Sequence, residues 1–149
     1  MNNRILVING PNLNLTGMRK PEVYGTTTLD EINEQIAQYA REKGLVCDFF
    51  QSNHEGGIID RLHEARGAYL GVILNAGAYT HYSYAIRDAI EAVELPVVEV
   101  HISNIFARDA FRAHSVLSEV CIGHISGFGA PGSYLLAVDA LSRLEKKSI

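Results

Sequence analysis

The sequence predicts an α/β domain in which a parallel sheet is covered by helices on both faces. Short runs rich in valine and isoleucine alternate along the chain with longer stretches of helical periodicity. The chain has 149 residues, 47% hydrophobic and 20% charged, which is enough for one domain with a buried core. Because strands that alternate with helices form βαβ units with parallel strands, we expect residues 1–149 to fold as a single α/β domain.

Each expected element follows from its local pattern. The run RILVI at residues 4–8 is the first strand. In the helix expected at residues 28–44, Thr28 and Glu31 have the spacing of a capping box, and Gly44 supplies the stop. The remaining elements are a strand at 46–51, a helix at 58–66, a strand at 69–77, a helix at 83–93, strands at 96–103 and 120–126, and a helix at 133–147.

Charge and cysteine content exclude several classes of protein. With 13 Lys and Arg against 17 Asp and Glu, the net charge is -4 and there is no basic run, which argues against nucleic acid or an anionic membrane as a partner. No signal-like segment is present, and no apolar run approaches the ~20 residues of a membrane helix, so we expect a cytoplasmic protein. Cys47 and Cys121 stand alone in apolar runs and are expected to pack as small core residues.

A long polar segment follows the first strand. Residues 9–25 read NGPNLNLTGMRKPEVYG and contain three asparagines, Arg19 and Tyr24, but almost no core-forming pattern. Loops of this length are usually functional or disordered. The number of hydrogen-bonding side chains favours a functional loop.

Polar residues also follow the other central strands, at the carboxyl ends where open parallel sheets bind ligands. The residues concerned are Asn12, Arg19 and Tyr24 after the first strand, Asn75 and His81 after the third, and Glu99, His101, Ser103, Arg108 and Arg112 at or beyond the end of the fourth. We therefore expect these side chains to converge on one edge of the sheet.

Glu99 and His101 are the strongest catalytic candidates in this set. In the strand EVHIS they lie two residues apart, on the same side, where the carboxylate can orient the imidazole and keep it protonated. The other histidines have weaker claims: His54 as a cap or loop donor, His63 on a helix surface, and His114 and His124 as structural residues. None of the six histidines has a known metal-binding spacing, so no metal is expected.

The segment GFGAPG at 127–132 matches the formal dinucleotide-binding pattern G-x-G-x-x-G. That fingerprint belongs at the start of a βαβ unit with an acidic residue about 20 positions later, and here the chain ends first. The glycines more simply allow a tight turn and close packing against the last helix.

Five blocks resemble, in order and spacing, the type II 3-dehydroquinate dehydratases: NGPNLNLTGMRKPEVYG, QSNHEGGIIDRLHEA, LNAGAYTHYSYAIRDAI, PVVEVHISNIFARDAFRAHS and ISGFG. The resemblance covers nearly the whole chain. It implies a flavodoxin-like three-layer sandwich with a five-stranded parallel sheet of order 2-1-3-4-5, no cofactor, and a dodecamer built from four trimers. The sequence departs from the family at Ala76, where proline is common, and at Phe106 and Ala113, where histidines are common.

The reaction implied by the resemblance is anti elimination of water from 3-dehydroquinate through an enolate, giving 3-dehydroshikimate. The resemblance implies a place in aromatic biosynthesis by the shikimate route, with quinate breakdown by the same reaction as the alternative. Tyr24 resembles the base, its phenol made acidic by Arg19 with help from Arg108. The resemblance further implies that Asn12 steadies the enolate oxygen and that His101, held by Glu99, protonates the leaving hydroxyl. The substrate ligands implied are the backbone N–H groups of Ile102 and Ser103 for the carboxylate, the side chains of Asn75, His81 and Arg112 for the hydroxyls, and Asp88, which reaches a neighbouring subunit's site.

A flavodoxin-like binding module is the alternative from a different class, since a fold alone does not fix function. A receiver domain needs a cluster of acidic residues after the first strand, where this chain has asparagines, and a flavin mononucleotide carrier needs a phosphate loop there.

Overall fold

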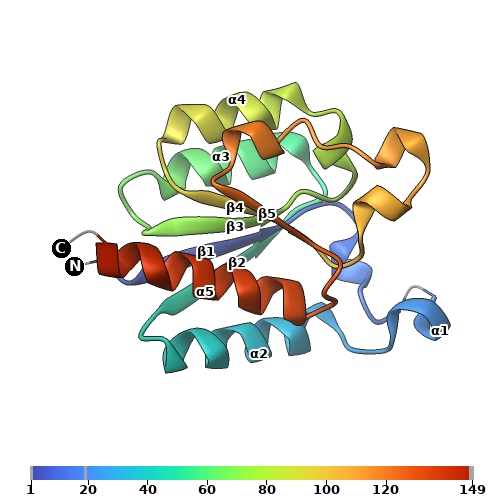
Figure 1. The fold of residues 1–149 in the computed structure, drawn as a ribbon, viewed down its shortest axis with the longest axis horizontal. Helices are drawn as coiled ribbons and strands as arrows, with labels where there is room; N and C mark the ends of the chain where they lie inside the picture. The colour runs from blue at the N-terminus through green and yellow to red at the C-terminus, as the bar shows by residue number, and fades with distance from the viewer. Residues whose placement is uncertain (1, 19, 148–149) are drawn as a thin grey trace.

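The computed structural model describes residues 2–18 and 20–147, and it has the expected three layers (Figure 1). Its sheet has five parallel strands in the order β2-β1-β3-β4-β5, which confirms the order implied by the resemblance. The strands are β1 (Arg4–Asn9), β2 (Val46–Gln51), β3 (Gly71–Asn75), β4 (Val97–His101) and β5 (Gly123–Ser126).

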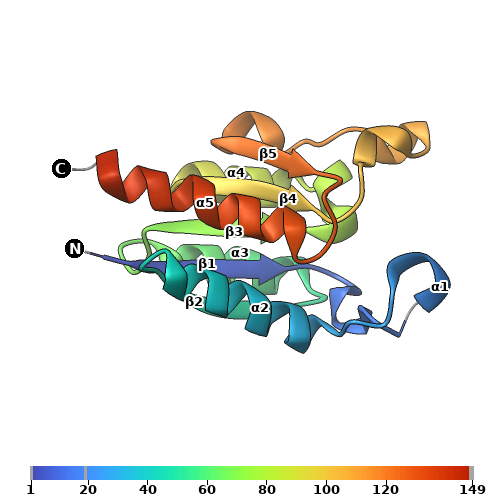
Figure 2. The ribbon, with the colours of Figure 1, turned by 60° about the horizontal axis from the view of Figure 1, so that its bottom comes forward.

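Two pairs of helices cover the sheet. Helices α2 (Leu29–Glu42) and α5 (Gly132–Lys147) lie on one face, and α3 (Glu55–Ala65) and α4 (Tyr84–Val93) lie on the other, as the two views in Figures 1 and 2 show. Side chains of β1 pack against both helical layers because successive side chains of a strand point to opposite faces. Ile5 and Val7 pack in the cluster under α2 and α5, whereas Leu6 and Ile8 pack under α3 and α4. A strand buried on both sides explains the unbroken apolar run in the sequence.

The capping signals of α2 act as expected. The Thr28 hydroxyl accepts a hydrogen bond from the Glu31 N–H at 3.2 Å and donates to the Glu31 carboxylate at 3.1 Å. Gly44 has a φ of +79°, a left-handed conformation that glycine adopts without strain and that suits the end of a helix.

Several predicted boundaries are wrong. The last strand begins at Gly123 and not at residue 120, because Ser118–Val120 forms a 3-10 turn, η5. The Ser115 hydroxyl stabilises this turn by accepting hydrogen bonds from the Leu117 and Ser118 N–H groups. Helix α3 begins at Glu55, three residues before the predicted start, since two glycines conceal its periodicity. The predicted strands at 69–77 and 96–103 are confirmed only in their centres, β3 and β4.

The glycine-rich segment 127–132 is a turn that leads into α5. Gly127 and Gly129 have φ values of +97° and +77°. The Phe128 N–H donates to the Ser133 hydroxyl at 3.0 Å, which fixes the start of the helix. The structure therefore agrees with the interpretation of these glycines as turn residues.

Cys47 and Cys121 are partly buried against the two core clusters, and burial raises the pKa of each thiol to about 12. Thiols of such high pKa are inert, which agrees with a packing role. Among the described residues, no helix has both the length and the apolar character needed to cross a membrane.

Candidate active site

The segments that follow β1, β3 and β4 gather at the carboxyl edge of the sheet, on the right in Figure 1. The loops after β1 and β3 are in direct contact: the Gly10 N–H donates to the Asn75 carbonyl at 2.7 Å. A Cβ atom at Gly10 would lie 2.5 Å from the Ala76 carbonyl oxygen, so this position admits no side chain. The packing fixes the root of the segment that carries Asn12.

Glu99 and His101 form a buried pair at the end of β4. Glu99 is fully buried, His101 is 3% exposed, and the Glu99 Oε2 to His101 Nε2 distance is 2.6 Å. This confirms that the two side chains lie on the same side of the strand. Ser115 and Ser118 donate hydrogen bonds to the second oxygen, Oε1, at 2.9 and 2.6 Å.

These contacts decide the charge of Glu99. Burial acts to raise the pKa of Glu99, but the hydrogen bonds from His101, Ser118 and Ser115, together with the charge of His101, hold it below its ordinary value. The carboxylate is therefore ionised at neutral pH and accepts hydrogen bonds only. It follows that the proton between Glu99 and His101 sits on His101 Nε2, which leaves His101 Nδ1 as the nitrogen that can exchange a proton with a ligand.

A third group joins this pair from the neighbouring strand. The register of β4 with β5 places His124 opposite Glu99, with its Nδ1 3.3 Å from Glu99 Oε2. Glu99, His101 and His124 offer atoms within 4.8 Å of one another, so together they form the candidate metal-binding group. The Glu99 carboxylate and the facing nitrogens of both imidazoles are, however, already engaged with one another or with Ser118, and we interpret the group as a hydrogen-bonded cluster.

His81 is held in one tautomer. Its Nδ1 lies 2.6 Å from the His114 carbonyl oxygen, and His114 Nε2 lies 3.0 Å from the His81 carbonyl oxygen. Burial lowers the pKa of His81, and the charges of His101, Arg108 and Arg112 lower it further. His81 is therefore neutral at pH 7, with Nδ1 protonated and the lone pair of Nε2 available to a ligand.

Asn75 is held by a buried chain of hydrogen bonds. Its Nδ2 donates to the Tyr134 hydroxyl at 3.0 Å, and that hydroxyl donates to Asn9 Oδ1 at 2.5 Å. The Asn75 Oδ1 accepts from the Gly77 N–H at 3.2 Å. These bonds fix the orientation of the amide and leave one N–H of Nδ2 for a ligand.

Asn12 lies in a loop that is supported by polar groups at the end of β2 and just after it. It has a left-handed φ of 69°, and its N–H donates to Asn53 Oδ1 at 3.0 Å. Gln51 donates to the Gly10 carbonyl and to Asn53 Oδ1, both at 3.1 Å. No local pattern points to Gln51 or Asn53, because their partners Gly10 and Asn12 are 41 residues away.

The rest of this segment turns back on itself at Gly17. Gly17 has a φ of +91°, and a Cβ atom there would lie 2.8 Å from the carbonyl oxygens of Thr26 and Thr27. Residue 17 is therefore packed against residues 26–27. We call this contact the neck, and the residues between 17 and 26 the excursion. Tyr24 is the last residue of α1 (Pro21–Tyr24), whereas Arg19 lies outside the described residues, so the predicted contact between them stays a prediction.

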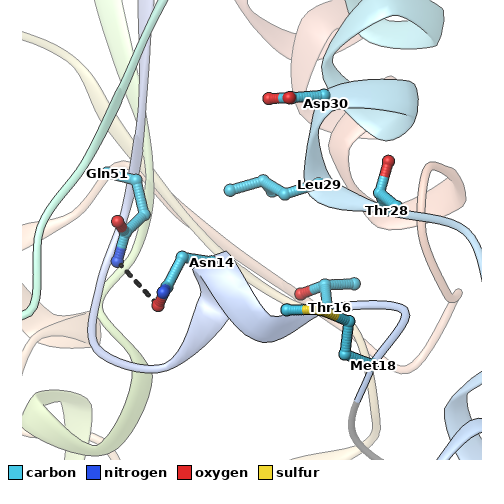
Figure 3. Close-up of a pocket in the computed structure, with 7 residues that line it drawn as sticks. All are labelled: Asn14, Thr16, Met18, Thr28, Leu29, Asp30 and Gln51. Carbon is cyan, nitrogen blue, oxygen red and sulfur yellow. Dashed lines mark hydrogen bonds between the residues drawn. The ribbon is translucent and has the colours of Figure 1, made fainter.

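A hollow of about 410 Å³ lies beside this excursion, between the loop after β1, the start of α2 and the end of β2 (Figure 3). Its lining consists of Asn14, Thr16, Met18, Thr28, Leu29, Asp30 and Gln51. Strands β1 and β3 separate β2 from β4 in the sheet. The hollow therefore adjoins the β1 side of the site rather than the Glu99–His101 pair.

The remaining predicted residues lie on or beyond β4 and on α4. Among the described residues, no hydrogen bond uses the backbone N–H of Ile102 or Ser103. The Arg108 guanidinium donates to the Ser103 hydroxyl, and Arg112, in the 3-10 turn η4 (Ala110–Arg112), is exposed. Asp88 is exposed on α4.

Comparison with known proteins identifies the family. Residues 3–142 match the family Dehydroquinase class II. The chain belongs to this family. A 3-dehydroquinate dehydratase of Ruegeria pomeroyi is 59% identical over 138 residues, 93% of this chain and 92% of that protein. One from Caldicellulosiruptor saccharolyticus is 56% identical over 95% of this chain and 97% of that protein.

A solved structure supports the same assignment. The type II dehydroquinase from Propionibacterium acnes has a TM-score of 0.90 to this chain at 42% identity, and the match covers 96% of this chain and 98% of that one. The resemblance found in the sequence and the flavodoxin-like fold are thereby confirmed.

Proposed function

We propose that the chain dehydrates 3-dehydroquinate to 3-dehydroshikimate. The observation that carries the proposal is the match to the dehydroquinase family over residues 3–142, combined with the buried Glu99–His101 pair at the edge where parallel sheets bind ligands. The two relatives named above bear the name of this activity.

In the first step, Tyr24 takes a proton from the carbon beside the ketone, and the electrons of the C–H bond form an enolate. A phenol titrates near 10, so a nearby cation must make it more acidic. Arg19 has this role: a unit charge at ~4 Å in an effective dielectric of ~20 is worth about 4 kcal/mol, comparable to the roughly three pKa units required. Arg108 assists from the loop after β4. Asn12 stabilises the enolate oxygen as a hydrogen-bond donor.

In the second step, the enolate electrons form the new double bond and the hydroxyl leaves as water after protonation by His101. The two steps remove groups from opposite faces, so the elimination is anti. The geometry at His101 supports its part in this scheme. Because Glu99 holds the proton of Nε2, the catalytic proton is carried on Nδ1.

Substrate binding uses groups with matching chemistry. Backbone N–H groups of Ile102 and Ser103 bind the carboxylate, and the absence of other described hydrogen bonds to them supports this. The neutral His81 accepts a hydrogen bond from a substrate hydroxyl through Nε2, while Asn75 and Arg112 bind other hydroxyls.

The assembly we propose is a homo-oligomer of trimers that forms a dodecamer, in which Asp88 reaches a neighbouring site. The exposure of Asp88 on α4 is consistent with this role. We place the enzyme in the cytoplasm and in the shikimate pathway, with quinate breakdown as the alternative that uses the same reaction. Sedimentation of a fully active monomer at the assay concentration would contradict the shared site.

The central test is an ultraviolet assay of 3-dehydroquinate dehydration by the purified protein, with EDTA present and no cofactor added. We expect full activity. Loss of activity in EDTA that a divalent metal restores would refute the metal-free mechanism. Borohydride should not inactivate the enzyme in the presence of substrate, since no lysine lies among the candidate residues to form a Schiff base.

A further inference from the structure

The Glu99 carboxylate is in contact with more groups than the pair with His101 requires. Its Oε2 faces two imidazoles, His101 Nε2 at 2.6 Å and His124 Nδ1 at 3.3 Å. Its Oε1 accepts from the hydroxyls of Ser115 and Ser118. Together these four groups leave the carboxylate little freedom to rotate. His124 and Ser118 come from β5 and from the turn that precedes it, so they are independent of the strand that carries the pair.

The hydrogens in this cluster can be assigned by counting donors. Ser118 has one hydroxyl hydrogen, and the ionised carboxylate of Glu99 takes it at 2.6 Å. The Ser118 oxygen, 3.1 Å from His124 Nδ1, must therefore accept a hydrogen from that nitrogen. The result is a directed chain in which His124 donates to Ser118 and Ser118 donates to Glu99.

The other nitrogen of His124 supports this assignment. His124 Nε2 is a buried atom with no hydrogen-bond partner among the described residues. The rings of His101 and Phe106 lie beside His124, with centroids 5.3 and 5.6 Å away. Because no acceptor in the described part of the chain faces Nε2, a hydrogen placed on this nitrogen would be buried without a partner, which is unfavourable. That tautomer would also direct the lone pair of Nδ1 at the negative charge of Glu99.

We propose that His124 is a positioning residue for His101. Its Nδ1–H holds Ser118, and through Ser118 it holds Glu99 in the orientation that keeps the His101 proton on Nε2 and directs Nδ1 to the ligand. His124 itself does not touch the substrate. This inference rests on the proposed function of His101 as the acid.

Two substitutions at one position test the proposal. His124→Val removes both nitrogens and suits a strand, whereas in His124→Asn the amide N–H occupies the place of Nδ1–H. Loss of an outer partner typically costs 10–100-fold, so the kcat of His124→Val should fall roughly 10-fold or more, with KM changed less than about twofold. His124→Asn should restore most of the lost kcat. His63→Ala, on the exposed surface of α3, is the control that should match the wild type.

The route through His101 gives a second test. In a His101→Ala background, His124→Val should lower the residual kcat no further, because residues that act as a unit are not additive. An equal loss in both backgrounds would assign His124 a general structural role. If His124→Val fails to fold, Ser118→Ala breaks the same chain and should show the same fall in kcat and the same dependence on His101.

A measurement that does not need turnover separates this inference from the proposed function. Long-range ¹H–¹⁵N NMR spectra of the neutral rings should show protonation at Nε2 of His101 and at Nδ1 of His124. A His124 protonated at Nε2, or an unchanged kcat in a folded His124→Val variant, would overturn the proposal. If the wild type fails to dehydrate 3-dehydroquinate, the proposed function fails, while the NMR result still decides whether the chain of donors exists.

Discussion

Removal of one hydroxyl from α5 should disturb both the stability of the fold and the candidate site. Tyr134 is fully buried, and its hydroxyl joins Asn9 of β1 to Asn75 of β3. Burial raises the pKa of Tyr134 far above the neutral range, so the hydroxyl is present as a donor at any ordinary assay pH. Tyr134→Phe keeps the ring and its packing but leaves Asn9 Oδ1 and one N–H of Asn75 without partners.

The size of the effect follows from the burial of these two groups. Asn9 is 1% exposed and Asn75 is 4% exposed, so water cannot replace the hydroxyl without rearrangement. Each buried group left unpaired costs about 1–3 kcal/mol, and partial relaxation makes a combined loss of about 2–4 kcal/mol the reasonable expectation. Because the amide of Asn75 is no longer oriented, KM for the substrate should also rise.

Urea denaturation measures the stability, and Tyr39→Phe is the matched control. Tyr39 also loses a hydroxyl that is hydrogen-bonded, to Asp139 at 2.9 Å, but at a half-buried position that water reaches. That variant should lose much less stability than Tyr134→Phe, since a partner that water can reach is not left unpaired. If Tyr134→Phe were no less stable than Tyr39→Phe, the buried chain would contribute nothing and the argument would be wrong.

Four other substitutions give three separate tests. Turnover should collapse by at least ~10²-fold in Tyr24→Phe at every pH. Arg19→Ala should instead recover part of its turnover as the pH rises toward ~10, where the phenol of Tyr24 ionises without help. A pH–rate profile without that difference would place the base elsewhere. Since the pKa of Glu99 is lowered in the fold, its charge stabilises the protein above its ordinary pKa of 4.5, and this contribution is lost as the pH falls through the folded pKa. Urea curves should therefore show Glu99→Gln much less stable than the wild type at about pH 7 and closer to it at about pH 3.5. Ala76 has a φ of −79° and follows an extended residue, which is the backbone geometry that proline prefers. Ala76→Pro should therefore stabilise the fold by about 0.4–1 kcal/mol. A lower melting temperature would show that the proline ring does not fit.

Much of the fold could be predicted from local pattern. The run Ile5 to Ile8 is apolar throughout because β1 lies between two helical layers, and the capping residue Thr28 marks the start of α2 with a contact only three residues long. The Glu99–His101 pair was equally accessible, because both residues lie on one strand and the period of a strand places them on the same side.

The rest of the site depends on long-range contacts that no local pattern reveals. The partner of Glu99 on β5 is fixed by the register Glu99↔His124, which the sequence does not specify. Tyr134 meets Asn9 across 125 residues. Val120, the last residue of the turn Ser118–Val120, is predicted as strand because it begins the apolar run 120–122, and the hydrogen bonds to the Ser115 hydroxyl that stabilise the turn are not visible in that pattern.

Because the neck joins residue 17 to residues 26–27, the excursion that contains Arg19 and Tyr24 can be exchanged as one unit. Its root tolerates no side chain, since a Cβ atom at residue 17 would meet two carbonyl oxygens at 2.8 Å. The excursion comprises the residues between 17 and 26, and at Gly25 within it a Cβ atom would meet no atom within 4 Å. Exchange of this stretch between members of the family should therefore succeed when the joints are placed at Gly17 and Thr26. Joints nearer to Gly10 would divide the packed contact between the loops after β1 and β3, and such chimaeras should fold less stably.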